Sequence, residues 1–134
     1  MGKTARAVIF ENNRLLVFFR RRIMEGSEIT YYAIPGGHVE HDETMEETVI
    51  REIKEELNLD IEILSYLGNI IVNDNEEYYY YVKVVGGELR FGGEELERNC
   101  NDNYYEIRWL TIDEINNSNI MALDLIKRVM EYEN

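Results

Sequence analysis

The chain has 134 residues, of which 45% are hydrophobic, which suits one domain with a single core. Its 27 acidic and 14 basic residues give a formal net charge of −13, which argues against a nucleic-acid polymer or an anionic membrane as partner. Cys100 is the only cysteine, so no intrachain disulfide forms and a reducing compartment is favoured. Without a signal-peptide pattern or an apolar stretch of about 18 residues, the expected location is the cytoplasm.

The first third of the chain has the pattern of strands joined by short polar segments. Residues 4–10 and 14–20 are predicted to form a hairpin around a turn at 11–13. The continuous apolar run at 15–19 indicates that the second strand is buried on both sheet faces. A polar loop is expected over 23–29, followed by a third strand over 30–34.

Arg20, Arg21 and Arg22 form the only basic cluster of the acidic sequence. One interpretation is a solvated strand end. The other is that Arg20 or Arg22 binds a substrate phosphate through the planar guanidinium fork. The sequence alone leaves both open.

A glycine pair precedes the predicted main helix. Gly36 and Gly37 allow a loop whose backbone approaches a ligand closely. Thr44 and Glu47 have the spacing of a capping box, which predicts a helix beginning at Thr44. Apolar residues recur every fourth position in this helix, so one face is expected to be buried. These residues are Met45, Val49, Ile53 and Leu57.

Three carboxylates share another stripe of the same predicted helix. Glu52, Glu55 and Glu56 fall within one arc of about 100°. Close carboxylates repel by ~1 kcal/mol per pair even in water, and a hard divalent cation would stabilise them. The alternative is a solvated acidic face on which Arg51 reaches Glu55 at four-residue spacing.

The rest of the chain predicts further strands and a terminal helix. Strands are expected over 60–73, 76–85 and 104–110, with a short strand over 88–91 and a bend or bulge at Gly68. The tyrosines at 78–81 place two rings on each strand face, either for packing or for stacking on a nucleobase. A helical turn over 111–115 and a helix over 119–132 follow, and this helix should cover the sheet face opposite the first helix.

The stretch from Gly37 to Leu59 resembles the Nudix box, the signature of the Nudix hydrolases, and the preceding YYAIPGG resembles the approach to that box. The fixed positions are occupied by Gly37, Glu43, Arg51, Glu52, Ile53, Glu55, Glu56 and Leu59. Asn58 stands where the family usually has Gly. This difference is mild, because Asn is the best non-Gly residue for the left-handed conformation that ends a helix.

Strands followed by two well-separated helices predict an α/β fold, with an α/β/α sandwich around a mixed central β-sheet. The resemblance implies the same Nudix-type fold, in one domain over residues 1–134. It also implies Mg²⁺, or Mn²⁺, as the cofactor. The implied metal ligands are Glu52, Glu55, Glu56 and the backbone carbonyl of Gly37.

The resemblance assigns further roles around this site. The general base would be Glu52, Glu55 or a glutamate of the 94–97 loop, where Glu97 lies at about the family's position. Arg51 would orient the glutamates and pair with Glu43, while Gly36 supports the loop. His38 is expected to be structural or to face the substrate, since His38 and His41 lack a third nitrogen or sulfur ligand for zinc.

The resemblance implies hydrolysis of a nucleoside diphosphate linked to a group X. A (deoxy)nucleoside triphosphate pyrophosphohydrolase that releases nucleoside monophosphate and pyrophosphate is the default expectation, with housecleaning of oxidised nucleotides as one version. ADP-ribose and dinucleoside polyphosphates stay open, although Pro35 is the only proline and ADP-ribose hydrolases tend to have one past the box. A non-catalytic nucleotide sensor is the alternative of another class. Homodimers are common in the family.

Overall fold

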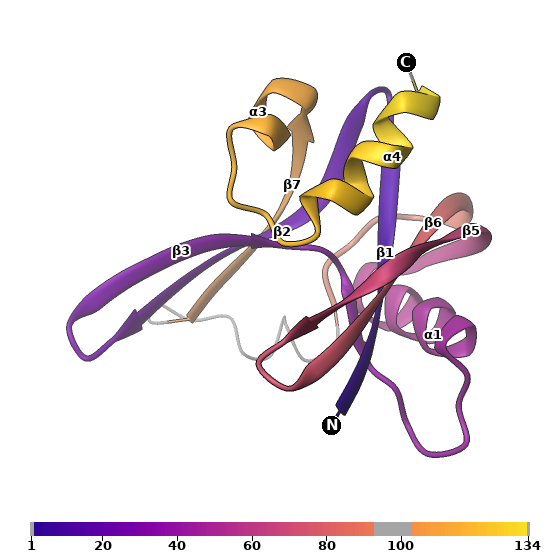
Figure 1. The fold of residues 1–134 in the computed structure, drawn as a ribbon, viewed down its shortest axis with the longest axis horizontal. Coiled ribbons are helices and arrows are strands. Elements are labelled where there is room, and N and C mark those ends of the chain that lie inside the picture. The colour runs from indigo at the N-terminus through magenta and orange to yellow at the C-terminus, as the bar shows by residue number, and fades with distance from the viewer. Residues whose placement is uncertain (1, 93–102, 134) are drawn as a thin grey trace.

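The computed structural model describes residues 2–92 and 103–133. Within these ranges the chain forms seven strands and three helices (Figure 1). The strands are β1 (Gly2–Glu11), β2 (Arg14–Met24), β3 (Ser27–Ala33), β4 (Gly36–His38), β5 (Leu59–Val72), β6 (Asn75–Gly87) and β7 (Asn103–Thr111). The helices are α1 (Met45–Leu57), α3 (Ile112–Asn116) and α4 (Leu123–Glu133).

The strands form one mixed sheet in the order β3-β2-β1-β6-β5, with β4 paired to β1 and β7 paired to β2. The strands β1 and β6 run parallel, and the other neighbours are antiparallel. The long strand β5 changes register with β6 between Tyr66 and Gly68, which agrees with the irregularity predicted at Gly68. The mixed central sheet expected from the sequence is therefore confirmed.

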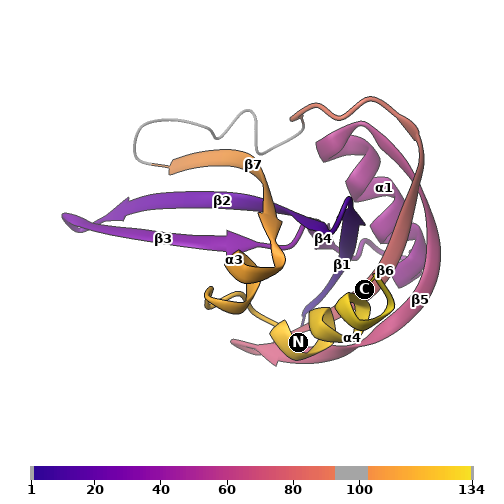
Figure 2. The same cartoon turned by 90° about the horizontal axis from the view of Figure 1, so that it is seen from above.

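The two longer helices lie on opposite sides of β1, as Figure 2 shows. On the α1 side, Val49, Ile53 and Leu57 pack with Leu16 in one buried cluster. On the α4 side, Ile126 and Val129 belong to a second buried cluster that includes Val8 and Val17. The residues of β1 and β2 thus alternate between the two cores, which is why their apolar run is continuous.

The tyrosine run of β6 divides between the same two cores. Tyr79 and Tyr81 contact the α4-side cluster, and Tyr78 and Tyr80 contact the α1-side cluster. Tyr79 and Tyr80 are buried. The prediction of two rings on each face is confirmed, and these two buried rings serve packing.

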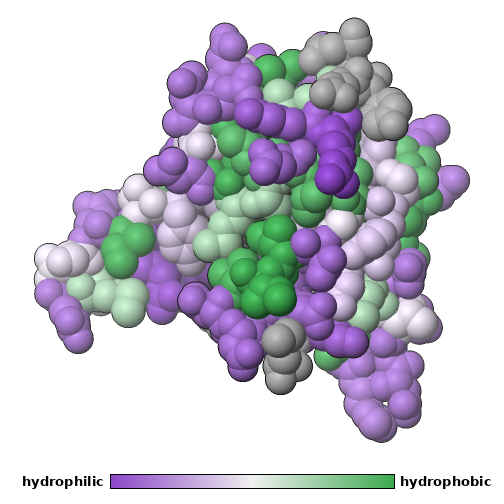
Figure 3. All heavy atoms as spheres, in the orientation of Figure 1, coloured by the Kyte–Doolittle hydropathy of each residue, from purple (hydrophilic) through white to green (hydrophobic). Residues whose placement is uncertain are grey.

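The hairpin β2–β3 is longer than the sequence pattern indicated. The polar loop predicted over 23–29 is wrong, because Glu25 and Gly26 alone form the turn, with φ values of 53° and 80°. Two residues with positive φ match the strand twist, so polar residues beside them stay in the strands. The hairpin projects from the body (Figure 1), and Ile23 and Met24 near its turn are exposed. Figure 3 shows that the face of the molecule seen in this view is mixed in hydropathy.

Two other boundaries differ from the predictions. Residues 88–91 form no strand, because Arg90 N–H donates to the carbonyl oxygen of Leu57, and Gly92 N–H donates to that of Glu56. This segment satisfies carbonyls at the end of α1 instead of pairing with the sheet. The last helix begins at Leu123, not at residue 119, because Ala122 has a φ of 62° and interrupts the helical backbone.

Candidate active site

The helix α1 begins and ends as its sequence predicts. Thr44 Oγ1 accepts from Glu47 N–H at 3.1 Å, and Glu47 Oε1 accepts from Thr44 N–H at 3.0 Å, which forms the predicted capping box. Asn58 ends the helix in the left-handed conformation, with φ 58° and ψ 34°. Its Nδ2 also donates to the carbonyl oxygen of Glu88 at 2.9 Å.

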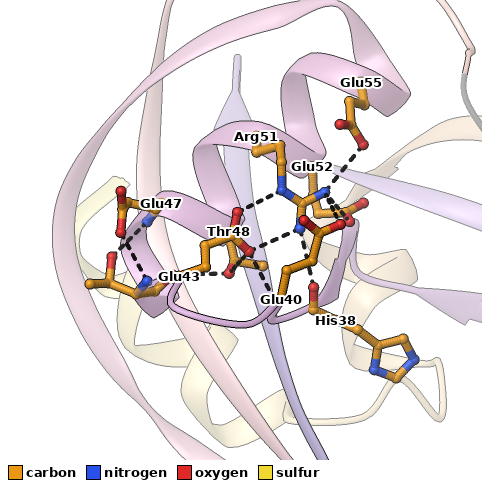
Figure 4. Close-up of polar contacts among 9 residues, drawn as sticks. His38, Glu40, Glu43, Glu47, Thr48, Arg51, Glu52 and Glu55 are labelled. Atoms are coloured by element: carbon orange, nitrogen blue, oxygen red, sulfur yellow. Dashed lines mark hydrogen bonds and ion pairs between the residues drawn. The ribbon is translucent and has the colours of Figure 1, made fainter.

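Arg51 lies at the centre of an ion-pair network that Figure 4 shows. It binds Glu43 through two donors, Nε at 2.7 Å and Nη2 at 3.0 Å. Its Nη1 donates to Glu52 at 2.9 Å and to Glu55 at 3.3 Å. Its Nη2 also donates to the His38 carbonyl oxygen at 3.2 Å. Arg51 thereby joins α1 to β4 and to the loop between them.

Glu43 is a fixed anion in this network. Arg51, followed by the Thr48 hydroxyl at 2.6 Å, lowers the pKa of Glu43 to about 2. Glu43 in turn raises the pKa of Arg51. Glu43 accepts hydrogen bonds from Thr48 and from two nitrogens of Arg51, and so it orients the arginine. Glu52, Glu55 and Glu56 are therefore not required to hold Arg51 in place.

A polar pocket of about 410 Å³ lies beside this network. Eight of the residues singled out in the sequence line it. They are Arg20, Gly36, Gly37, His38, Arg51, Glu52, Glu55 and Glu56. Residues from β1, β2, β4, α1, β6 and β7 contribute to its wall, so the pocket depends on the whole sheet order.

Gly37 lies directly against Glu52. A Cβ atom at position 37 would overlap the Glu52 carboxyl group. At the neighbouring Gly36, a Cβ would overlap the Ala5 carbonyl oxygen of β1. Both glycines are therefore needed for close approach to neighbouring protein groups, whereas the predicted approach to a ligand stays a prediction.

The donors fit a hard divalent cation by chemistry. Glu52, Glu55 and Glu56 supply carboxylate oxygens, and Gly37 brings its backbone against one of them. Glu56 is buried, whereas the side chain of Glu55 is 55% exposed. In the part of the chain described, no three His, Cys, Asp or Glu side chains already converge on one point, since Glu52 and Glu55 turn toward Arg51.

The two arginines proposed for phosphate differ in position. Arg20 lines the pocket, donates to the Tyr105 hydroxyl and lies 4.3 Å from the centre of that ring. Arg22 is exposed further along β2 and does not line the pocket. The structure therefore brings Arg20, but not Arg22, to the glutamates. Glu97 lies outside the described residues.

Sequence reasoning missed a half-buried ion pair in the same pocket. Arg6 Nε donates to Glu77 Oε1 at 2.7 Å, from the parallel strands β1 and β6. Burial raises the pKa of Glu77, but Arg6 outweighs it, so the pKa lies below its ordinary value. No local pattern marks this pair, because Arg6 shares β1 with Lys3 and Glu11, and Glu77 shares β6 with Glu76 and Lys83.

The fold and pocket define an α/β protein with an acidic helix facing a polar cavity. The NUDIX domain family matches residues 1–130, so the chain belongs to the Nudix hydrolase family. The resemblance carried by Gly37 to Leu59 is confirmed.

Individual relatives agree with this assignment. An ADP-ribose pyrophosphatase of Methanocaldococcus jannaschii is 35% identical over 97 residues, which cover 67% of this chain and 55% of that protein. The match thus spans about half the length of this relative. Among solved structures, a MutT NUDIX hydrolase from Burkholderia pseudomallei has a TM-score of 0.72 at 23% identity, covering 96% of this chain and 97% of that chain. At that identity the likeness establishes the fold.

Proposed function

We propose that the chain hydrolyses a nucleoside diphosphate linked to a group X, with a divalent cation as cofactor. The observation that carries the proposal is the single pocket that brings Arg20 and Gly37 to the carboxylates of Glu52, Glu55 and Glu56. Carboxylate oxygens suit a hard cation, and an arginine suits phosphate oxygens. A diphosphate carried in with a metal also fits a chain whose net charge is −13.

Glu52, Glu55, Glu56 and the Gly37 carbonyl would hold Mg²⁺, or Mn²⁺. When bound, the cation would offset the substrate's negative charge and lower the pKa of a coordinated water. Arg51 is bonded to Glu52 and Glu55 and so positions them at the pocket. Glu43 keeps Arg51 in place and would not contact substrate.

The chain's own groups would complete the reaction. Arg20 would bind a phosphate oxygen of the diphosphate, because it is a cation at the pocket wall. The Tyr105 ring holds its guanidinium there. A glutamate would accept the proton of the attacking water, and a ligand glutamate can do so only where the remaining ligands suffice to hold the cation. Glu52 and Glu55 are the candidates in the pocket, and Glu97 stays a prediction from the family resemblance.

Two substrate classes deserve direct comparison. The default is a (deoxy)nucleoside triphosphate, cleaved to nucleoside monophosphate and pyrophosphate. ADP-ribose is the second, supported by the name of the archaeal relative at 35% identity. Dinucleoside polyphosphates complete the set that shares the nucleoside diphosphate group.

The test is product analysis by chromatography after incubation with Mg²⁺ or Mn²⁺. The panel holds nucleoside triphosphates, 8-oxo-dGTP, ADP-ribose and a diadenosine polyphosphate. Glu56→Gln should abolish turnover, whereas Glu62→Gln, which removes an exposed carboxylate from β5, should leave it unchanged. Equal losses in both variants would contradict the ligand assignment.

A non-catalytic nucleotide-binding module is the competing class. Such a module needs no intact set of carboxylates, yet Glu52, Glu55 and Glu56 all line the pocket together with Arg51. Nucleotide binding without cleavage of any panel member would favour this class over the hydrolase.

A further inference from the structure

His38 belongs to the pocket wall but not to the ion-pair network of Arg51. Figure 4 shows its ring directed away from the labelled glutamates of α1. The ring instead faces β1, where Thr4 is its cross-strand partner. Thr4 Oγ1 lies 3.3 Å from His38 Nδ1. The His38 ring therefore contacts the sheet, whereas the His38 backbone carbonyl accepts a hydrogen bond from Arg51.

Thr4 is only 2% exposed, so the partners of its hydroxyl matter energetically. Within the described part of the chain, its Oγ1 has two side-chain neighbours. One is His38 Nδ1, and the other is Asn75 Nδ2 at 3.0 Å. All three residues line the pocket.

The orientation of the Asn75 amide decides the direction of these bonds. Arg6 and, to a smaller extent, the Asn75 side chain lower the pKa of Glu77, as expected where an amide N–H is directed at an ionised carboxylate. An ionised carboxylate only accepts, so the amide nitrogen must face it. The same nitrogen then donates its second hydrogen to Thr4 Oγ1.

The Thr4 hydroxyl accepts from Asn75 and still has a proton to donate. A buried hydroxyl that leaves its proton unbonded is destabilised by about 1–3 kcal/mol. His38 Nδ1 is the acceptor within reach. If Nδ1 accepts, the proton of the neutral imidazole must be on Nε2, at the other edge of the ring.

We propose that Glu77, Asn75 and Thr4 form a relay that holds neutral His38 as its Nε2–H tautomer, so that Nε2–H donates to an oxygen of the bound substrate. Thr4 and Asn75 are positioning residues that act through His38. The substrate contact rests on the proposed function, whereas the tautomer is a property of the free protein.

The tautomer can be read directly by ¹⁵N–¹H correlation NMR of the full chain at about pH 8.5, above the ordinary imidazole pKa. The chain has two histidines, and His41→Ala assigns their signals. His41, whose side chain is 95% exposed, serves as the internal comparison in the wild type. We expect His38 to have a protonated Nε2 and an unprotonated Nδ1. A protonated Nδ1 would overturn the relay without any variant being needed.

Matched variants test the role of Thr4. Thr4→Val keeps the shape and removes the donor, so the tautomer ratio of His38 should move toward a mixture, while Thr4→Ser should restore the Nε2–H form. An unchanged ratio in Thr4→Val would also overturn the relay.

The substrate contact is tested separately by kinetics on a substrate found by product analysis. Thr4→Val should raise KM about fivefold with little change in kcat, and Thr4→Ser should recover the wild-type KM. An unchanged KM despite a shifted tautomer would refute the contact between His38 and substrate. Absence of turnover in the wild type would refute the proposed function, and the NMR result would still decide the relay.

Discussion

At the scale of single residues, the orientation of the pocket carboxylates depends on which nitrogens of Arg51 are bonded to Glu43. Glu43 occupies Nε and Nη2 of the guanidinium, so Nη1 is the nitrogen that faces Glu52 and Glu55. The side chains of Glu43 and Arg51 are 14% and 24% exposed, which protects their paired bonds from solvent. The pair therefore acts as a fixed support for Glu52 and Glu55.

The low pKa of Glu43 predicts how stability changes with pH. Its pKa is about 2 in the folded chain, against an ordinary value of 4.5. Between these values the unfolded chain binds more protons, so stability falls as the pH falls. The contribution is complete above about pH 5 and is lost as the pH passes about 2.

Glu43→Gln should therefore show a flatter dependence of Tm on pH across this acidic range, measured by circular dichroism. Glu62→Gln is the control, because Glu62 is exposed on β5. If Glu43→Gln and the wild type lose Tm in parallel between about pH 5 and 2, the carboxylate is not the anion that the structure indicates.

Gly37→Ala tests the close approach of β4 to α1. The added Cβ would displace the Glu52 carboxylate, and with it the hydrogen bond from Arg51. We expect the apparent affinity for Mg²⁺, measured by thermal shift, to fall about 10- to 100-fold. Gly86→Ala is the matched control, since its Cβ would meet the Asp60 side chain, whose nearest atom is Oδ2 at 3.1 Å. Equal Mg²⁺ affinities in the two variants would contradict the expectation.

The site residues that the sequence could predict are those whose spacing along a helix puts their side chains on the same face. Glu52, Glu55 and Glu56 share one stripe of a helix, so their common pocket follows from helical geometry. Arg6 and Glu77 are 71 positions apart, and their contact depends on the parallel register of β1 and β6. No local periodicity contains that register, which is why the pair was missed.

At the scale of elements, Asn58 governs the end of α1. It adopts φ 58° and also bonds to the Glu88 carbonyl, so it connects the helix to the segment after β6. Asn58→Ala should destabilise the fold by about 1–2 kcal/mol, because Ala is disfavoured at positive φ and loses this bond. Urea unfolding measures the difference.

Asn58→Gly separates the two contributions of this residue. Glycine relieves the backbone but cannot bond to Glu88, so its stability should lie between those of the wild type and Asn58→Ala. Asn58→Ala with wild-type stability would show that the left-handed end is not under strain.

Element boundaries were less predictable than element types, for reasons visible at particular residues. Ser27 and Glu28 are polar but pair with Met24 and Ile23 in a hairpin whose turn has two residues. Ile120 is buried and fits the apolar period of α4, yet it precedes the helix start at Leu123. The residue types indicate which positions are buried and which are polar. The residue at which a helix or strand ends depends instead on backbone φ values that many residue types can adopt.

At the scale of the whole molecule, the sheet order assembles the pocket from residues as far apart in the sequence as Thr4 and Tyr105. The central strand β1 pairs with β2, β4 and β6, so Thr4 and Arg6 meet residues of β4 and β6. The strand β2 brings Arg20 to Tyr105 of β7. The helix α1 supplies only part of the pocket wall. The other wall residues belong to strands that the tertiary structure brings beside this helix.

The net charge of −13 allows a test that separates general screening from a specific metal site. Salt reduces self-repulsion whatever the cation, so ionic strength must be held at about 0.15 M. Under that condition, a cation that binds only the folded chain adds about 2.7 kcal/mol when present at 100 times its Kd. Replacing NaCl by about 5 mM MgCl₂ should therefore raise Tm through specific binding.

The increase should disappear in a triple variant with Gln at positions 52, 55 and 56. It should persist in a charge-matched triple variant with Gln at positions 11, 25 and 62, which are exposed glutamates outside the pocket. Both variants remove three negative charges and so relieve self-repulsion equally. A loss of the Mg²⁺ effect in both would assign it to net charge, and only a loss confined to the pocket variant supports a metal site on α1.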